Sequence, residues 1–107
     1  MKRLSEDETA RRAMSAGVIA DIANERERQV CKEKWTPEHD DEHGAGEMAH
    51  AAGAYAFGPA FDEIISKVWP WDWKWWKPSD RRRNLVKAGA LIVAEIERLD
   101  RLSAKQS

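Results

Sequence analysis

The sequence predicts an all-α protein: a small helical bundle of three long helices and a short one, crossed by an extended strap rich in tryptophan and proline. Apolar residues recur three and four positions apart along most of the chain. Helix start signals, Ser5 and Thr36-Pro37, precede two of these segments. Because 107 residues suit one compact core, we expect a single helical domain over residues 1–107.

The first helix is predicted over about 6–33. Ser5 and Glu8 have the spacing of a capping box, in which each side chain bonds a free amide at the start of the helix. One side of the helical wheel is apolar and predicts the face that packs in the bundle. Its members are Ala10, Met14, Val18 and Ile22.

Two further helices are predicted over about 37–57 and 60–67. Thr36 is a suitable N-cap, and Pro37 suits the first helical position, where its missing N–H costs nothing. The middle of the longer helix, "GAGEMAHAAGAYA", consists of small side chains that allow close packing against another helix or close approach of a ligand. Gly58-Pro59 ends it, and "PAFDEIISKV" gives the short helix.

The segment 68–79 contains five of the six tryptophans and is predicted to be a loop. Alternation of Trp with Pro, Asp and Lys would place the rings on one face of an extended strap, which we interpret as a lid that closes a narrow bundle. One or two exposed rings would remain free to stack on a base. The last helix follows over about 80–103, with an apolar seam at heptad-like spacing. The seam consists of Leu85, Ala88, Ile92, Ile96 and Leu99.

Charge and cysteine content restrict the environment and the partners. Lys and Arg number 18 against 19 Asp and Glu, so the chain has no overall field that would draw it to nucleic acid or acidic lipid. The single cysteine, Cys31, excludes an internal disulfide and is typical of a reducing compartment. The N-terminal residues have no apolar run like that of a signal peptide, and no stretch is long enough to span a bilayer. We expect a cytoplasmic protein with no membrane partner.

Polar residues interrupt the apolar face of the first helix. They are Asp21, Glu25, Arg28 and Gln29. Buried charges are costly unless they are paired or bind a metal, so these side chains require a partner. An internal salt bridge from Glu25 to Arg28 is the structural alternative to a functional site.

A second polar group follows the predicted second helix at spacings of three, seven and ten residues. It consists of Asp40, His43, Glu47 and His50. Oxygen and nitrogen ligands from one helix face can converge on a divalent metal. The alternative is that the acids cap the helix start and the histidines lie on the surface beside them.

The last helix adds one carboxylate and several cations. Glu95 flanks the apolar seam, and Lys87 with Arg81 to Arg83 are candidate phosphate contacts, although the arginines also suit a solvated helix start. Glu25, Glu47 and Glu95 would then meet from three helices. Carboxylates gathered in a helical bundle commonly hold Mg²⁺ or Mn²⁺, and these ions clamp nucleotide phosphates. The sequence therefore raises nucleotide binding as a functional hypothesis.

Four segments together resemble a family of small, mostly uncharacterised bacteriophage and prophage proteins. They are "ERERQ", "KWTPEHDDEHGAGEMAHAAGAYA", "WPWDWKWWKP" and "RRRNLVKAGALIVAEIERLDR", and they lie within residues 21–101. More loosely, "GEMAHAA" followed by an acid-bearing helix looks like the all-α pyrophosphatases of the MazG type, which cleave nucleoside triphosphates using Mg²⁺ held by Glu and Asp. This superfamily has a Glu-x-x-Glu pair followed by a Glu-x-x-Asp pair. Here His50 stands where Glu47 would have its second acid.

The resemblance implies a Mg²⁺-dependent nucleoside triphosphate pyrophosphohydrolase acting in phage nucleotide metabolism. The expected metal ligands are Glu25, Glu47, Glu95, Asp40 and His43; the expected catalytic residues are His50, which would orient the attacking water, and Asp41. The expected ligand contacts are Arg28, Gln29, Lys87, Trp75 and Trp76.

The alternative is a non-catalytic accessory protein that sequesters a host signalling nucleotide or inhibits a host defence protein. Such a protein needs the same polar pocket or an aromatic surface, and no metal. Single-stranded nucleic acid is a disfavoured partner, because acids flank the aromatic and basic stretch "WKWWKPSDRRR". Long helices around a narrow core commonly bury their remaining apolar surface in a homodimer, which we expect here.

Overall fold

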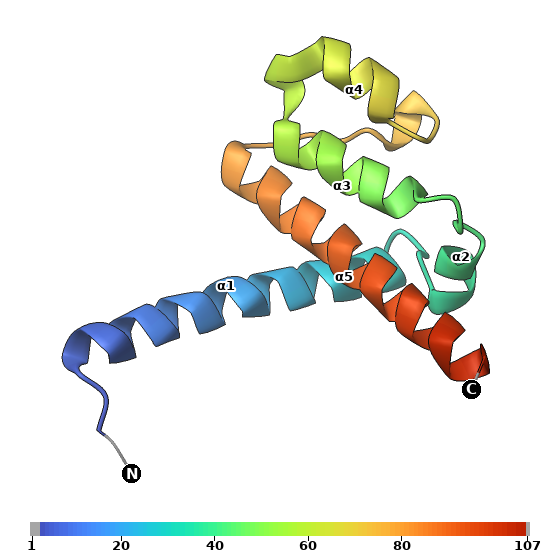
Figure 1. The fold of residues 1–107 in the computed structure, drawn as a ribbon. Coiled ribbons are helices and arrows are strands. Elements are labelled where there is room, and N and C mark those ends of the chain that lie inside the picture. Colours follow the sequence, from blue (N-terminus) through green and yellow to red (C-terminus); the bar gives the residue numbers. More distant parts are fainter. Residues whose placement is uncertain (1–2, 107) are drawn as a thin grey trace.

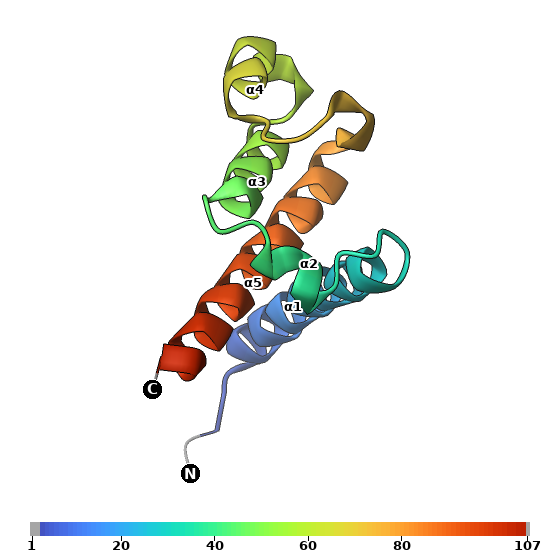
Figure 2. The ribbon, with the colours of Figure 1, turned by 90° about the vertical axis from the view of Figure 1, so that its right-hand side faces the viewer.

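The computed structural model describes residues 3–106, which form helices and turns and no β-strand, so the all-α class is confirmed. The α-helices are α1 (Glu6–Cys31), α2 (Pro37–Asp41), α3 (Glu47–Phe57), α4 (Asp62–Val68) and α5 (Arg81–Gln106), and the 3-10 turns are η1 (Pro59–Phe61) and η2 (Trp73–Trp75). In Figures 1 and 2, α3 lies alongside α5, α4 lies on the far side of α3, and α1 crosses α5.

The core lies between α3 and α5, whose facing sides are lined by alanine. The alanines of this core are Ala51, Ala52 and Ala54 of α3 and Ala88 and Ala94 of α5. Met48 and Leu91 are the largest apolar side chains with almost no exposed surface. The close helix packing expected from the small residues of the second segment is confirmed.

Only the C-terminal part of α1 packs against the body of the protein. Its crossing with α5 is tight, because a Cβ at Gly89 would lie only 2.9 Å from Cδ1 of Ile22. The first part of α1, residues 6–20, projects away from the body as an arm (Figure 1). The predicted buried face of this helix is therefore wrong, since Met14 is 74% exposed and Val18 is also exposed.

The second predicted helix, 37–57, is two helices joined by a glycine-containing loop. Thr36 caps α2 as expected, with its Oγ1 accepting a hydrogen bond from the backbone N of His39 at 3.2 Å. The chain turns at Gly46, whose φ of 87° lies in the left-handed region that favours glycine. The Glu47 carboxylate then accepts a bond from the backbone N of Ala45 at 2.7 Å and holds the loop. The prediction of one continuous helix over residues 37–57 is therefore wrong, because the chain turns at Gly46.

Most of the predicted seam of α5 is not buried. The exposed members of the seam are Leu85, Ile92, Ile96 and Leu99. The core side of α5 lies further round the helix, where Asn84, Ala88 and Leu91 are buried. The periodicity correctly located an apolar stripe, but α3 packs against the neighbouring side of the helix.

The tryptophan segment covers one end of the core, as the lid interpretation expects, but it is not an extended strap. Trp69 is buried and contacts Tyr55 edge to face, with ring centroids 5.7 Å apart. The η2 turn interrupts the alternation, since the Asp72 side chain accepts a bond from the backbone N of Lys74 at 2.9 Å. Trp73 consequently faces solvent, with 53% of its surface exposed.

A buried arginine joins α1, α2 and α5. The Arg26 guanidinium donates to Oδ2 of Asp40 at 2.7 Å, to Oε1 of Glu97 at 3.0 Å and to the carbonyl of Trp35 at 3.1 Å. Asp40 is almost fully buried. These three bonds fix the position of the loop between α1 and α2. Within residues 3–106, no helix has the length and apolar character needed to cross a membrane.

Candidate functional site

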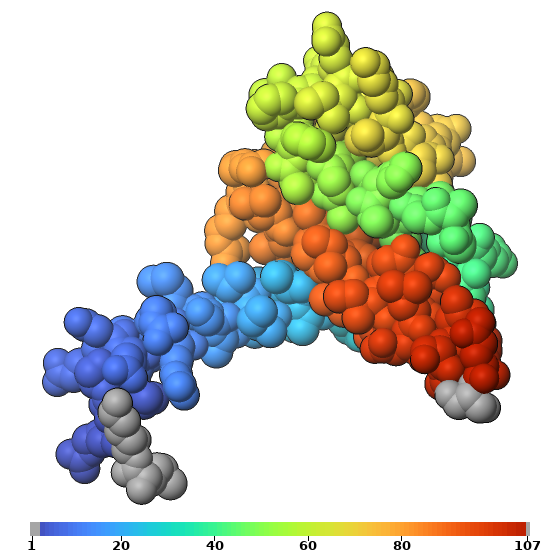
Figure 3. Space-filling model, viewed as in Figure 1, coloured from blue at the N-terminus to red at the C-terminus, as the bar shows by residue number. Residues whose placement is uncertain are grey.

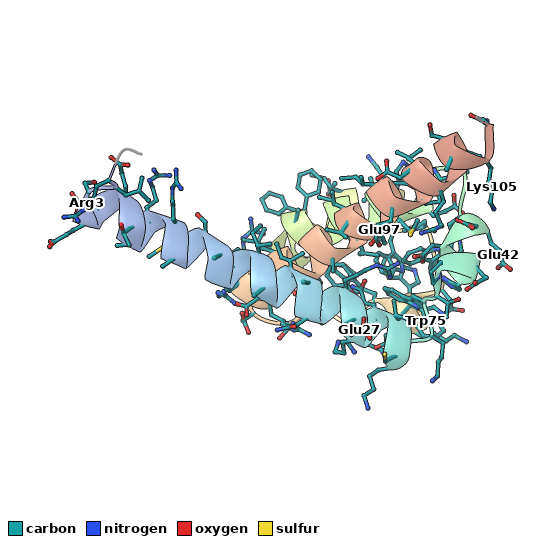
Figure 4. The ribbon with its side chains drawn as sticks, turned by 90° about the horizontal axis from the view of Figure 1, so that it is seen from below. Arg3, Glu27, Glu42, Trp75, Glu97 and Lys105 are labelled. Carbon is teal, nitrogen blue, oxygen red and sulfur yellow. The ribbon has the colours of Figure 1, made fainter. Side chains whose placement is uncertain are left out.

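Three neighbouring cavities lie along the C-terminal half of α1, and each shares lining residues with the next. An aromatic cavity of about 350 Å³ lies beyond the end of α1, a narrow polar cavity of about 20 Å³ lies next to it, and a basic cavity of about 340 Å³ follows. Glu33, Trp35 and Trp75 line both of the first two, and Glu25 and Arg28 line both of the last two. In Figure 4, side chains crowd the region around Trp75 and thin out along the arm toward Arg3.

The aromatic cavity is built by the α1–α2 loop, α2 and the tryptophan segment. Its lining residues are Glu33, Lys34, Trp35, His39, His43, Trp71, Asp72 and Trp75. The Trp35 ring is parallel to His39 within 5° and lies 5.7 Å from Trp71. Nε1 of Trp71 is buried and has no hydrogen-bond partner among the described residues. The cavity therefore offers π-faces to a flat ligand.

Two histidines one helical turn apart form one wall of the aromatic cavity. Their Nε2 atoms are 3.4 Å apart. Nδ1 of His43 lies 3.0 Å from Oε2 of Glu47, and Nδ1 of His39 lies 3.4 Å from Oδ1 of Asp40. The hydrogen bond from His43 lowers the pKa of Glu47 below its ordinary value.

These contacts determine what the histidine pair can hold. The two rings meet edge to face with their centroids 4.7 Å apart, and either Nε2 can donate to the other, depending on the tautomers. Two metal–nitrogen bonds of about 2.0–2.1 Å at a tetrahedral angle span a separation similar to that of the two Nε2 atoms. Within residues 3–106, no group of three or more His, Cys, Asp or Glu side chains is placed to hold a metal ion. A metal at the pair would take its other ligands from water or from a bound molecule.

The narrow polar cavity surrounds a carboxylate with no exposed surface. Glu25 accepts bonds from Arg28 at 2.8 and 2.9 Å and from Arg83 of α5. Burial alone would raise the pKa of Glu25, but the bonds and charges of the two arginines outweigh it, and the pKa lies below its ordinary value. Gln29 donates to Glu25 at 3.3 Å, while its own buried Oε1 has no partner among the described residues.

Lys87 and Lys77 close the polar cavity beside Tyr55. Nζ of Lys87 donates to the Lys77 carbonyl at 2.6 Å and lies 5.6 Å from the centre of the Tyr55 ring. Burial and the charge of Arg83 lower the pKa of Lys87. Nζ of Lys77 lies over the Trp75 ring, 3.8 Å from Glu33, and its side chain is largely exposed. An anion entering here would meet the amine of Lys87, which has no ion pair among the described residues, and that of Lys77, whose ion pair with Glu33 is long.

The basic cavity lies on the opposite side of Glu25, between α1 and the start of α5. Its lining residues are Asp21, Asn24, Glu25, Arg28, Arg82, Arg83 and Val86. Arg82 donates to Oδ2 of Asp21 at 2.6 Å, and this pair is largely exposed. Three arginines against two carboxylates leave this cavity with an excess of positive charge.

The structure brings together four of the five expected ligand contacts. Arg28, Gln29, Lys87 and Trp75 all line the polar cavity. The fifth, Trp76, lines none of the three cavities and packs against Tyr55 and Trp69, with ring centroids 4.8 and 5.0 Å away. The inward orientation expected for Glu25 and Gln29 is confirmed, and the salt bridge from Glu25 to Arg28 is present.

The expected metal ligands and catalytic residues have separate partners. Glu47 bonds His43, Glu95 bonds Arg98 at 2.5 Å, and Asp40 bonds Arg26. Asp41 is paired with Arg101 at 2.8 Å, which lowers the pKa of Asp41, and His50 is exposed on α3. Glu25, Glu47 and Glu95 come from three helices as expected, but only Glu25 lines these cavities.

The sequence reasoning missed Trp35, His39, Trp71 and Lys77. The spacing of His39 and His43 by four residues was a signal for a shared face, and Trp35 is the one tryptophan outside the Trp-rich segment. No protein-family model, curated protein or solved structure matches the chain. The chemistry of the cavities is therefore the basis for a functional assignment.

Proposed function

We propose that this protein binds a nucleotide, or another flat ring bearing phosphate, without turning it over. The observation that supports this most directly is that an aromatic cavity shares lining residues with a polar cavity lined by Arg28, Lys77 and Lys87. Trp35 and Trp75 line both of them, so one molecule can contact both.

The base would occupy the aromatic cavity among Trp35, Trp71 and Trp75. A volume of about 350 Å³ is within the usual range for small-molecule sites. Stacking of one base on aromatic side chains contributes about 1–3 kcal/mol. His39 and His43, which line the same cavity, would contact an edge of the base.

The phosphates would lie at the mouth of the polar cavity, against Lys77 and Lys87, and Lys34 of the aromatic cavity is a further cation for them. Lys77 and Lys34 have exposed side chains that can move toward an anion, and Lys87 would regain an ordinary pKa beside one. Gln29 Oε1 supplies an unused acceptor for a sugar hydroxyl. Arg28 would reinforce this end, although its guanidinium already bonds Glu25 and Glu33.

The ion pairs and hydrogen bonds of the three carboxylates expected to bind Mg²⁺ favour binding without turnover over Mg²⁺-dependent hydrolysis. Glu25 is neutralised by two arginines, and Glu47 and Glu95 are bonded to other groups. A Mg²⁺ or Mn²⁺ site made by these three residues would require several ion pairs to break. In the phage setting that the sequence resemblance implies, such a protein would sequester a host nucleotide.

Titration calorimetry against nucleoside triphosphates, monophosphates and cyclic nucleotides, each with Mg²⁺ and with EDTA, tests this proposal. We expect at least one nucleotide to bind in both conditions and to raise the melting temperature, since ligand at 100 times Kd adds about 2.7 kcal/mol to stability. Pyrophosphate is measured in the same samples, and we expect none. Release of pyrophosphate with Mg²⁺ would replace the proposal with a hydrolase.

Two pairs of variants locate the site. Trp71→Ala should weaken binding by about 10- to 100-fold through lost stacking, whereas Trp73→Ala, outside the cavities, should not change it. Lys77→Ala should weaken binding, and Lys67→Ala, an exposed cation on α4, should not. Lys77 is exposed, so its replacement preserves the fold even if Trp71→Ala does not. The proposal fails if no nucleotide binds, or if each control weakens binding as much as its partner variant.

A further inference from the structure

The chain exposes more surface than a compact protein of its mass. Its accessible surface is 7442 Å², whereas a folded monomer of 12.2 kDa exposes about 6,100 Å². Its radius of gyration is 16.2 Å, against about 13 Å for a compact domain of this length. The excess of about 1,400 Å² exceeds the roughly 800 Å² that each partner buries in a standard interface.

Much of this surface belongs to the arm, residues 6–20. All of its side chains except Glu8 are classed as exposed, and they include Met14, Val18 and Ile19. Helices of about 15 residues are marginal in water unless an apolar face packs against something. Within residues 3–106 nothing covers the arm (Figure 3), so its stability requires a partner.

A matching surface lies on α5. Leu85, Ile92, Ile96 and Leu99 form a stripe at heptad-like spacing, and each is 43–51% exposed. We call these four residues the α5 stripe. It spans 15 residues, as the arm does, so each is about 22 Å long. The arm of a second copy therefore has both the length and the apolar side chains to cover the stripe.

The shape of the molecule suits this arrangement. In Figure 3 the arm and the C-terminal half of α5 diverge from their crossing and leave an open concave side between them. One chain supplies both an uncovered helix and an uncovered stripe. A two-fold axis would cover both elements in both copies at once, which is the closed symmetry of most homodimers.

We propose that the chain forms a two-fold symmetric dimer in which the arm of each copy packs along the α5 stripe of the other. The four helices, α1 and α5 from each copy, then make a bundle at the interface. The aromatic cavity lies beyond the opposite end of α1 from the arm, so the proposal is independent of nucleotide binding.

Sedimentation equilibrium of the full chain at about 100 μM and about 1 μM, with a double variant Ile92→Glu/Ile96→Glu, tests the dimer. The wild type should have twice the 12.2 kDa mass of the chain, and the variant should be a monomer, because two carboxylates would be buried against the arm. The matched control is Phe61→Glu, which places one carboxylate at an equally exposed apolar position outside the arm and the stripe and should remain a dimer.

Hydrogen exchange then tests where the arm lies. Amides of residues 6–20 should be protected in the wild-type dimer and exchange freely in the double variant, while amides of α3 stay protected in both. Retained α3 protection shows that the variant is folded. A monomeric wild type at 100 μM, a dimer that Phe61→Glu disrupts and the double variant does not, or a wild-type dimer with an unprotected arm would each overturn the proposal.

Discussion

The tryptophan segment, residues 68–79, and the arm, residues 6–20, both carry apolar side chains, but the chain at least partly buries most of those of the first and leaves those of the second exposed. In each, several large apolar side chains lie close together in the sequence, but the chain folds back over those of the tryptophan segment and not over those of the arm. Trp69 and Tyr55 bury each other beneath the segment between Pro70 and Pro78, whereas Met14 and Ile92 remain exposed. The pattern of apolar residues thus predicts that a surface is covered, but it does not tell whether the same chain or another chain covers it.

The largest expected effect is a loss of stability when the buried ring of the tryptophan segment is removed. Trp69→Ala should lower the free energy of unfolding by about 3–5 kcal/mol, because the ring is 8% exposed and contacts several other aromatic rings. Urea denaturation followed by circular dichroism measures it. Trp73→Ala removes an equal volume from an exposed ring four residues away and should cost less than about 1 kcal/mol. Equal losses would mean that the lid does not form the core.

The next largest effect is expected at the buried ion pair between Arg26 of α1 and Asp40 of α2. Arg26→Met should cost about 3 kcal/mol, because it leaves the buried Asp40 carboxylate without its guanidinium partner. The same urea titration measures the loss, at fixed protein concentration. The double variant Arg26→Met/Asp40→Asn should recover part of it, since no unpaired buried charge remains. A double variant as unstable as the sum of the single ones would show that the pair is not coupled.

Much of the fold could be predicted from local chemistry. Ser5 and Thr36 cap helices where expected, and the alanine-rich segments do pack closely. The helix break at Gly46 was missed because glycine also fits inside helices, and only the φ of 87° decides its role. The exposed α5 stripe could not be predicted, because helical periodicity does not identify the neighbouring element.

The candidate site was partly predictable for a related reason. Glu25 and Gln29 were expected on an inner face and are buried, although Met14 and Val18 of the same face are exposed. The sequence therefore identified the polar residues but not the part of the helix that packs. The meeting of Trp35 with Trp71, 36 residues later, depends on how Arg26 positions the α1–α2 loop. The sequence likewise could not show whether Glu25, Glu47 and Glu95 meet, because this depends on how their three helices pack.

The smallest expected effect is the pH dependence contributed by Glu25, which lies where α1 passes from the arm into the body. Its pKa in the folded state lies below the ordinary 4.5, because Arg28 and Arg83 offset the effect of burial. A carboxyl with a lowered folded pKa stabilises the protein above its unfolded pKa, and this contribution is lost as the pH falls through the folded value. The free energy of unfolding should therefore decline below about pH 4.5.

Glu25→Gln separates this contribution from those of the other acids. The variant should be less stable at pH 7, because Arg28 and Arg83 lose a buried partner, and its stability should decline less steeply between pH 5 and pH 3. Asp41→Asn is the matched control: Arg101 also lowers the pKa of Asp41, but this pair is partly exposed, so its removal should flatten the profile less. Urea titrations across this range measure both. If Asp41→Asn flattened the decline more than Glu25→Gln, the exposed pairs of α5 and not the buried carboxylate of α1 would control the acid stability of the protein.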